Sequence, residues 1–331
     1  MKAIRVLSPG GPEVLRWEDL PEPVPGPGEV LVDVKAAGVN HLDLWVRKGL
    51  PGLTYPRTLG CDAAGLVRGT GQRVLLNPAT GCGTCEFCAD GQLPLCRDYS
   101  ILGEHRDGTQ AAAVCVPKAN AIPIPDSLSF EEAAAAPLVF LTAWRMIVTR
   151  GRLKPSEDVL VWSAGAGVGT VCVQFAKHAG ARVIATASSD EKCGKLKALG
   201  ADVVLNHSRE DAVKRVREIT GKRGVDLVVD YIGKETWAKS LACLRRGGRL
   251  VTCGATSGHD PVEDLRHVFY RQLEILGCTM GSNKELEDAL RLLFRGQVRP
   301  VIDSVLPMKD AAEAHRRLEN RTVFGKIVLT L

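Results

Sequence analysis

The chain has 331 residues, of which 45% are hydrophobic and 24% charged, a balance that excludes a disordered or fibrous protein. The 43 basic and 38 acidic residues leave a net charge of +5 without a basic run, so nothing indicates nucleic-acid binding. The length predicts two domains, because single hydrophobic cores stop growing at about 250–300 residues.

No segment indicates a membrane span or a secretory signal. The longest stretch without charge, residues 159–176, just reaches the ~18 residues of a candidate span. Its three glycines, Gly165, Gly167 and Gly169, divide it into a strand, a turn and the start of a helix. Because the N-terminus lacks the apolar core of a signal peptide, we expect a cytoplasmic protein.

Short strands separated by turns are predicted for the first part of the chain. Within Glu29–Lys35, the valines at 30, 32 and 34 share one face, and polar residues lie mainly on the other. Four prolines between Pro21 and Pro27 predict an extended connector before this strand.

Four of the eleven cysteines stand close together in a loop that also contains glycines. Their spacing is C-x2-C-x2-C-x7-C, formed by Cys82, Cys85, Cys88 and Cys96. An odd number of cysteines in a cytoplasmic chain argues against a disulfide framework, whereas four thiolates suit a closed, tetrahedral zinc site. We therefore predict a structural zinc lobe over residues 81–97, with an iron–sulfur cluster or four free thiols as the alternatives.

After residue 126 the pattern changes to alternating strands and helices. A buried helix is predicted over Glu131–Val148, with Pro137 inside it. The strands predicted after it are Asp158–Ser163, Arg182–Thr186, Asp202–Leu205, Asp226–Asp230, Arg249–Cys253 and Glu274–Gly277. This alternation predicts an α/β domain with a doubly wound parallel sheet that is covered on both faces. A further helix carries an apolar stripe from Leu286 to Leu293 and ends at Gly296, and residues 326–329 are predicted as a last strand.

A glycine-rich turn follows the first of these strands and opens a helix. The turn contains Gly165, Gly167, Val168 and Gly169. In this context, backbone N–H groups and the helix N-terminus can meet the pyrophosphate of a dinucleotide. The first two glycines of the G-x-G-x-x-G pattern are replaced by Ala164 and Ala166, so a tight turn without a ligand is the alternative.

The residues after the second strand bear on the choice of cofactor. Ala187 stands where NAD-binding proteins offer a carboxylate to the ribose hydroxyls. Ser188 and Lys192 follow and can instead bind a 2′-phosphate, which favours NADP(H) over NAD(H). Gly254, directly after the strand Arg249–Cys253, is a further candidate cofactor contact, because doubly wound sheets bind ligands at these strand ends.

With these motifs the chain resembles the medium-chain dehydrogenase/reductase superfamily over nearly its whole length. The cysteine lobe is similar to that of zinc-dependent alcohol dehydrogenases, whereas Ala37-Gly38-Val39-Asn40 and Arg47-Lys48-Gly49 resemble quinone oxidoreductases. The resemblance implies a Rossmann domain, residues 127–295, inserted into a GroES-like, mostly β catalytic domain formed by residues 1–126 and 296–331. It also implies a homodimer or homotetramer that pairs through the edge strand near Leu273–Gly277.

The same resemblance identifies departures from the family's catalytic zinc site. Its three ligand positions correspond here to Asn40, Cys61 and Leu138, of which only the cysteine is a good zinc donor. A proton-relaying threonine and a tyrosine of the family are replaced by Leu42 and Trp45. We therefore expect one structural zinc ion and no second, catalytic one. An altered metal site is the alternative, built from His41, Asp43, Cys61, Asp62 and His105.

These positions predict a reductase of small molecules. Alcohol oxidation passes through an alkoxide that a metal ion stabilises by several kcal/mol, whereas a conjugated acceptor spreads the developing charge. The predicted reaction is hydride transfer from NADPH to a quinone, an enal or a related activated carbonyl. Asn40 is expected to orient the substrate or nicotinamide, Thr142 to position the ring, and His41 to act as the acid or to contact the cofactor phosphates. The alternatives are an alcohol dehydrogenase with an atypical zinc site and a cofactor-binding protein without turnover.

Overall fold

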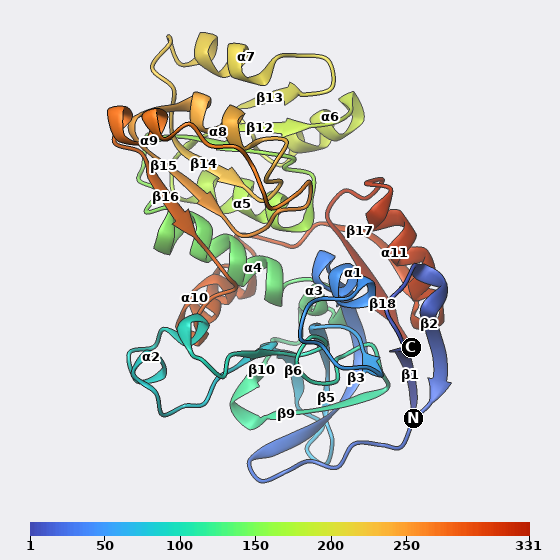
Figure 1. Ribbon diagram of the computed structural model, residues 1–331. Coiled ribbons are helices and arrows are strands. Elements are labelled where there is room, and N and C mark those ends of the chain that lie inside the picture. The colour runs from blue at the N-terminus through green and yellow to red at the C-terminus, as the bar shows by residue number, and fades with distance from the viewer. The chain divides into compact units, whose positions relative to one another are not determined.

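The computed structural model describes residues 1–331, which form two compact units. Unit 1 comprises residues 1–139 and 282–331, and unit 2 comprises residues 140–281. Both chain ends belong to unit 1, where the N- and C-termini lie close together (Figure 1). The predicted limits of the Rossmann domain, residues 127–295, are wider than unit 2, because helix α10 (Asn283–Phe294) lies within unit 1.

The main sheet of unit 1 has seven strands and joins the two ends of the chain. Their order is β10 (Ala121–Pro123), β6 (Arg73–Leu76), β5 (Asp62–Val67), β3 (Glu29–Val39), β18 (Lys326–Thr330) and β17 (Ile302–Pro307), and β9 (Ala113–Pro117) also pairs with β3. Val32 and Val34 are buried, as the alternation along β3 predicts. The strand is longer than predicted and contains an irregularity opposite β5, between Val34 and Ala36.

Smaller elements complete unit 1. One further sheet has the order β2 (Leu15–Asp19), β1 (Lys2–Val6) and β4 (Arg57–Thr58), and β7 (Ala79–Thr80) pairs with β8 (Ser100–Ile101). The other helices are α1 (His41–Lys48), α2 (Glu86–Ala89), α3 (Phe130–Ala134) and α11 (Ala311–Glu319), with short turns η1 (Pro12–Val14), η2 (Leu93–Leu95), η3 (Lys118–Asn120) and η5 (Met308–Asp310). Helix α1 begins directly after β3, and the backbone N–H of Asn40 donates to Asp43 at 2.7 Å.

The prediction of one continuous helix over Glu131–Val148 is wrong, because the helix is interrupted before Pro137. Helix α3 ends at Ala134, α4 covers Pro137–Trp144, and the π-helical segment η4 covers Arg145–Arg150. Proline lacks an N–H and disfavours helical geometry in the residue before it. As a consequence, the N–H of Leu138 lies in the first turn of α4, where it has no partner within the helix.

Unit 2 contains a six-stranded parallel sheet. The strand order is β13 (Val203–Asn206), β12 (Arg182–Ala187), β11 (Asp158–Val161), β14 (Val225–Asp230), β15 (Leu244–Thr252) and β16 (Glu274–Gly277). The helices are α5 (Gly167–His178), α6 (Asp190–Ala198), α7 (Ala212–Ile219), α8 (Trp237–Cys243) and α9 (Leu265–Arg271). Figure 1 shows α5 on one side of the sheet and α7 and α8 on the other. This order confirms the predicted doubly wound Rossmann fold.

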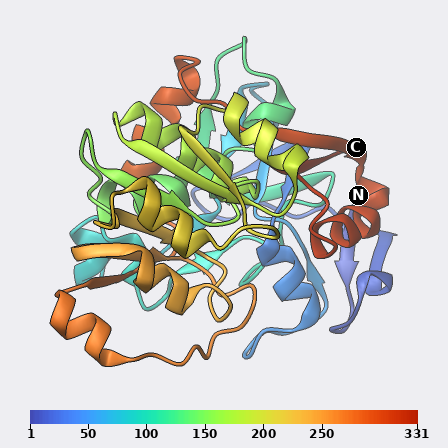
Figure 2. The ribbon, with the colours of Figure 1, turned by 90° about the horizontal axis from the view of Figure 1, so that it is seen from above.

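The buried stripe of α5 explains how the helix packs in unit 2. Val171, Cys172 and Phe175 are buried. The Phe175 ring meets the edges of Phe140 at 5.4 Å and Trp144 at 5.5 Å between ring centroids. In Figure 2, α9 lies at the margin of unit 2, at the end of a long connection after β15. None of the helices combines the length and the apolar character that a membrane span requires.

Candidate functional site

The predicted zinc lobe forms a compact loop around α2 in unit 1 (Figure 1). The sulfur atoms of Cys82, Cys85, Cys88 and Cys96 all lie within 4.8 Å of one another. The Cys82 sulfur is 3.9 Å from that of Cys88 and 3.6 Å from that of Cys96. A tetrahedral zinc site with bonds near 2.3 Å has sulfur–sulfur distances of about 3.8 Å. The four side chains therefore fit a zinc ion without rearrangement.

The electrostatics of the lobe also suit a cation. Backbone N–H groups of Thr84 and Cys85 donate to the Cys82 sulfur, which lowers the pKa of Cys82 to about 6. Desolvation and the neighbouring thiols raise the pKa of Cys88 to about 12. Four sulfurs this close cannot all be thiolates at neutral pH unless a cation lies between them.

A second polar cluster lies in the main sheet of unit 1, at the junction of β3, α1, β5 and β18. The Asn40 amide nitrogen donates to Asp62 Oδ2 at 2.9 Å and to the Cys61 sulfur at 3.3 Å. The Lys326 ammonium donates to Oδ1 of Asn40 and to Asp62 Oδ2, the latter at 3.2 Å. We call this group, Asn40, Cys61, Asp62 and Lys326, the lysine cluster. The sequence placed Lys326 at the start of the last predicted strand, and nothing indicated that it would meet Asn40.

Burial controls the protonation of groups in and beside the lysine cluster. Burial, together with the charges of Asp62 and Asp43, raises the pKa of the Cys61 thiol well above its ordinary value. Burial also raises the pKa of Asp43 to about 7, although Asp43 accepts N–H donors from Asn40 and Gly60. Desolvation and then the charge of Lys326 lower the pKa of His41 to about 4. At neutral pH, Cys61 is therefore a thiol and His41 a neutral imidazole.

The alternative metal site is not assembled in this structure. The group of histidine, cysteine or carboxylate donors that the structure brings together for a metal ion is the four lobe cysteines, and it includes none of the five residues of the alternative site. His105 lies in the loop after β8, where its Nδ1 accepts the N–H of Ile101 at 3.2 Å. Leu138 contributes only its backbone N–H, which donates to Asp62 Oδ1 at 2.9 Å. With Asn40 and Leu138 at two of the three ligand positions, the side chains as they stand do not form a second zinc site.

The predicted dinucleotide turn connects β11 to α5 in unit 2. Helix α5 begins after Ala166, whose side chain offers no cap, so its first N–H groups remain available to an anion. A Cβ on Gly169 would lie 2.3 Å from the Tyr231 hydroxyl oxygen and 2.7 Å from the Cα of Ala164. The Tyr231 hydroxyl donates to the carbonyl oxygen of Ser163 at 3.0 Å. Glycine is therefore required at 169 for packing, and Tyr231, which follows β14, contacts this turn in a way that the sequence did not reveal.

Polar side chains gather where β12 and β13 end. Ser189 caps α6 by accepting the backbone N–H of Lys192, and Ser188 is exposed beside it. The Ser208 hydroxyl donates to the Ser188 carbonyl at 3.0 Å, and Arg209 pairs with Asp190. Ala187 itself offers no carboxylate, and the carboxylates that follow it, Asp190 and Glu191, pair with Arg209 and Lys195. Arg209 is a cation near this strand end that the sequence analysis missed.

The remaining predicted contacts of unit 2 are Thr142 and Gly254. Thr142 is buried in α4, and its hydroxyl is 3.9 Å from the Met280 sulfur. Gly254 follows β15, and its carbonyl accepts from Thr252 at 3.2 Å. Both lie in unit 2, whereas Asn40 and His41 lie in unit 1, so the joint role of these residues stays a prediction.

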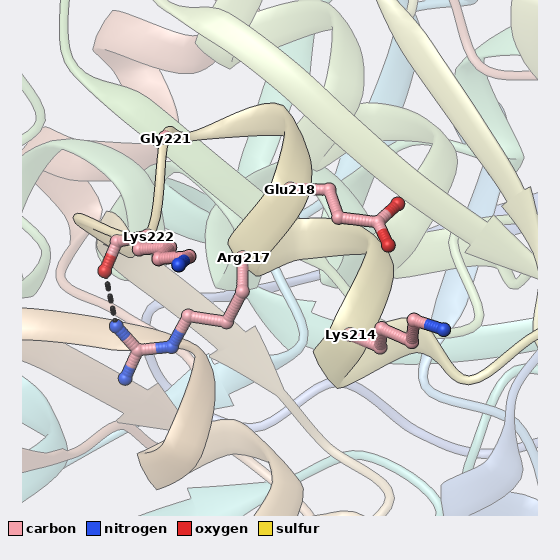
Figure 3. A pocket seen from close by; sticks show the side chains of 5 residues that line it. All are labelled: Lys214, Arg217, Glu218, Gly221 and Lys222. Carbon is pink, nitrogen blue, oxygen red and sulfur yellow. Dashed lines mark hydrogen bonds between the residues drawn. The ribbon is translucent and has the colours of Figure 1, made fainter.

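A surface pocket on α7 contains none of the predicted site residues. It is lined by Lys214, Arg217, Glu218, Gly221 and Lys222 (Figure 3). The Arg217 guanidinium donates to the carbonyl oxygens of Lys222 at 2.8 Å and Ala242 at 2.7 Å. The Arg217 guanidinium is thus bonded to backbone carbonyl oxygens beyond the C-terminal end of α7. The pocket plays no part in the candidate site.

Comparisons with known proteins agree with this geometry. Residues 26–126 match the alcohol dehydrogenase GroES-like domain, and residues 167–295 match the zinc-binding dehydrogenase family. A quinone oxidoreductase of Salmonella typhimurium is 34% identical over 97% of this chain and 96% of its own length. A 2-haloacrylate reductase of a Burkholderia species is 32% identical with the same coverage. A solved structure of an NAD-dependent alcohol dehydrogenase is 49% identical, with full coverage of both chains and a TM-score of 0.96.

Proposed function

The chain belongs to the medium-chain dehydrogenase/reductase superfamily of NAD(P)-dependent oxidoreductases, and from this premise we propose that it transfers hydride from NADPH to a quinone, an enal or a related activated carbonyl. One structural zinc ion, held by the four lobe cysteines, would complete the protein. That ion would hold the loop together and take no part in the reaction, because four sulfurs leave no position for a substrate.

The observation that carries the proposal is the donor set at the family's catalytic zinc position. Asn40 and Leu138 replace two zinc ligands, and the Cys61 thiol is kept protonated by burial. Losing a single oxyanion-stabilising donor typically costs ~3 kcal/mol, about a hundredfold in rate. The rate of oxidising an alcohol or reducing a simple aldehyde would fall by this full factor. A conjugated acceptor would lose less, because it spreads the developing negative charge over several atoms. Relatives named quinone oxidoreductase and 2-haloacrylate reductase favour the same class of acceptor.

We propose a separate role for each of Asn40, Thr142 and His41. Asn40 holds the lysine cluster together, because its amide nitrogen donates to Cys61 and Asp62 and its oxygen accepts from Lys326. By fixing the position of this cluster, it would orient the acceptor or the nicotinamide. Thr142 positions the nicotinamide ring. His41 is neutral in the free protein, so it becomes an acid only when a bound anion raises its pKa. The cofactor pyrophosphate is such an anion, which would reconcile the two roles expected for His41.

NADPH is the proposed form of the nicotinamide cofactor. Ser188 and Lys192 would meet the 2′-phosphate, and Ala187 provides no carboxylate to repel it. The turn residues Gly165, Gly167, Val168 and Gly169 would meet the pyrophosphate, and Gly254 the nicotinamide half. The relative of known structure named as NAD-dependent makes NAD(H) the form to compare in every binding assay.

A homodimer or homotetramer that pairs through β16 is also proposed. Strand β16 is the free edge of the unit 2 sheet, and Ile275 on it is 40% exposed. Two such edges can pair about a two-fold axis, which would extend the sheet across the interface. Sedimentation of the protein and of an Ile275→Lys variant tests this, because a charge at the edge should favour the monomer.

An alcohol dehydrogenase is the second candidate, and the 49% identity to a solved alcohol dehydrogenase favours it. The two candidates differ in which reaction proceeds at a useful rate. Stopped-flow oxidation of NADPH and NADH by quinones, enals and saturated aldehydes, with alcohol oxidation run in reverse, separates them. We expect turnover with the conjugated acceptors alone. Faster turnover of simple alcohols would establish the second candidate, and no oxidation by any acceptor would leave a cofactor-binding protein.

A further inference from the structure

We propose that the ammonium group of Lys326 takes the place of a second metal ion in unit 1. The chain would thus supply the positive group of its lysine cluster from a side chain rather than from a bound cation. This inference deepens the proposed function and rests on one part of it, the single zinc ion per chain.

The ammonium group is held by two buried acceptors. Its Nζ donates to Asp62 Oδ2 at 3.2 Å and to Asn40 Oδ1. The side chains of Lys326 and Asp62 are 3% and 0% exposed, so water does not screen the pair. A buried charge without partners is strongly unfavourable, and removing one partner of a buried pair typically costs about 3–5 kcal/mol. The ammonium is therefore a fixed component of the cluster.

The network around Lys326 includes all three ligand positions of the family's zinc site. Asn40 bonds both to the Cys61 sulfur and to Asp62. The second oxygen of Asp62 accepts the N–H of Leu138 at 2.9 Å. Asn40 and Leu138 are thus hydrogen-bonded directly to the Asp62 carboxylate that pairs with Lys326. Cys61 is linked to it through Asn40.

A divalent ion would compete with the ammonium for the same atoms. The oxygens of Asn40 and Asp62 that bond to Lys326 are the ones a metal ion would need. A metal ion beside the ammonium would also meet repulsion between like charges, which is strong where water is excluded. The structure can therefore hold either Lys326 in its present position or a metal ion, but not both.

The substitution has a chemical consequence. An ammonium group has three hydrogens, and Asn40 and Asp62 receive two of them. In the proposed reaction the third would donate to an oxygen atom of a bound acceptor. A singly charged donor stabilises a spread negative charge, but it supplies less than a divalent ion does to a localised alkoxide. This preference agrees with quinones and enals as acceptors.

Cobalt spectroscopy tests the inference without reference to activity. Zinc-loaded protein is titrated with Co²⁺, and the sulfur-to-cobalt absorption is recorded for the natural chain and for Lys326→Ala. We expect no new absorption in the natural chain. We expect Lys326→Ala to take up cobalt with absorption that disappears in the double variant Lys326→Ala/Cys61→Ser. Lys2→Ala is the matched control, because it removes a lysine–aspartate pair that is exposed.

Two results would overturn the inference. One is cobalt absorption in the natural chain that depends on Cys61, since a metal ion would then bind beside the ammonium. The other is a folded Lys326→Ala variant that takes up no cobalt, since the ammonium would then not be what excludes the metal. The measurement on the natural chain decides even if Lys326→Ala does not fold. Turnover of quinones or enals together with Cys61-dependent cobalt binding would refute only this inference, whereas absent turnover without such binding would refute only the proposed function.

Discussion

Replacing Gly169 with alanine should damage the dinucleotide turn, although the same change elsewhere in unit 2 should stabilise the protein. Gly169 lies in the first turn of α5, where the added Cβ would be 2.3 Å from the Tyr231 hydroxyl and 2.7 Å from the Cα of Ala164. Non-bonded carbon atoms normally stay about 3.5–4.0 Å apart. Because one of the two neighbours is backbone, the helix and the strand end must move apart.

The expected size of the effect follows from two opposing contributions. Overpacking a well-packed interior costs about 1–3 kcal/mol. Alanine gains about 0.5–1 kcal/mol over glycine within a helix. Gly169→Ala should therefore destabilise unit 2 by up to about 2.5 kcal/mol, the difference between these two contributions. The displaced turn should also weaken NADPH binding by about tenfold or more, since tenfold corresponds to ~1.4 kcal/mol.

Gly194→Ala is the matched control. Gly194 lies in α6, and nothing lies within 4 Å of the position that its Cβ would take. We expect this variant to be more stable by about 0.5–1 kcal/mol and to bind NADPH normally. Urea unfolding gives the stabilities, and NADPH fluorescence titration gives the affinities.

The Tyr231→Phe change separates the two contacts of the new methyl group. Phenylalanine removes the hydroxyl but leaves the contact with the backbone of Ala164. The double variant Gly169→Ala/Tyr231→Phe should therefore recover part of the lost stability and not all of it. If Gly169→Ala and Gly194→Ala shifted stability in the same direction, the packing argument for Gly169 would be refuted.

Three further predictions concern the metal lobe, pH and cofactor choice. Cys82→Ser should lose the zinc ion that metal analysis finds in the natural chain, whereas Cys61→Ser should keep it; the reverse pattern would place the metal in the lysine cluster. Burial, with the charge of Arg47, lowers the pKa of His315 to about 3. In the unfolded chain His315 takes up a proton near its ordinary pKa of about 6.5, whereas in the folded chain it stays neutral until about pH 3. The free energy of unfolding therefore falls as the pH drops from 6.5 towards 3. Urea unfolding between about pH 7 and about pH 5 should show a smaller loss for His315→Gln, and an unchanged slope would contradict this assignment. Lys192→Ala should weaken NADPH binding by about fivefold to tenfold and leave NADH binding unchanged, with Lys195→Ala as the control; equal losses for both cofactors would argue against a 2′-phosphate contact.

The sequence by itself predicted most of the features that depend on residues close together in the chain. The spacing of Cys82 to Cys96 brings four sulfurs together because one short loop carries all of them. The alternation of apolar strands and helices predicted the Rossmann sheet, since its inner strands β11, β12 and β14 are buried on both faces. The strand Glu274–Gly277 was predicted to the residue. Local pattern was less reliable at Pro137, where the effect of proline on the preceding residues outweighed a continuous apolar run.

Only the tertiary structure decided what surrounds Asn40 and Gly169. Lys326 contacts Asn40, which lies 286 positions earlier in the chain, because the last strand, β18, pairs with β3 in the main sheet of unit 1. Tyr231 reaches the turn beside Gly169 because β14 lies next to β11 in the parallel sheet. Residue types and spacing reveal which groups a loop or helix can bring together. Contacts between distant strands depend on register and strand order, which a single sequence does not specify at the level of individual side chains.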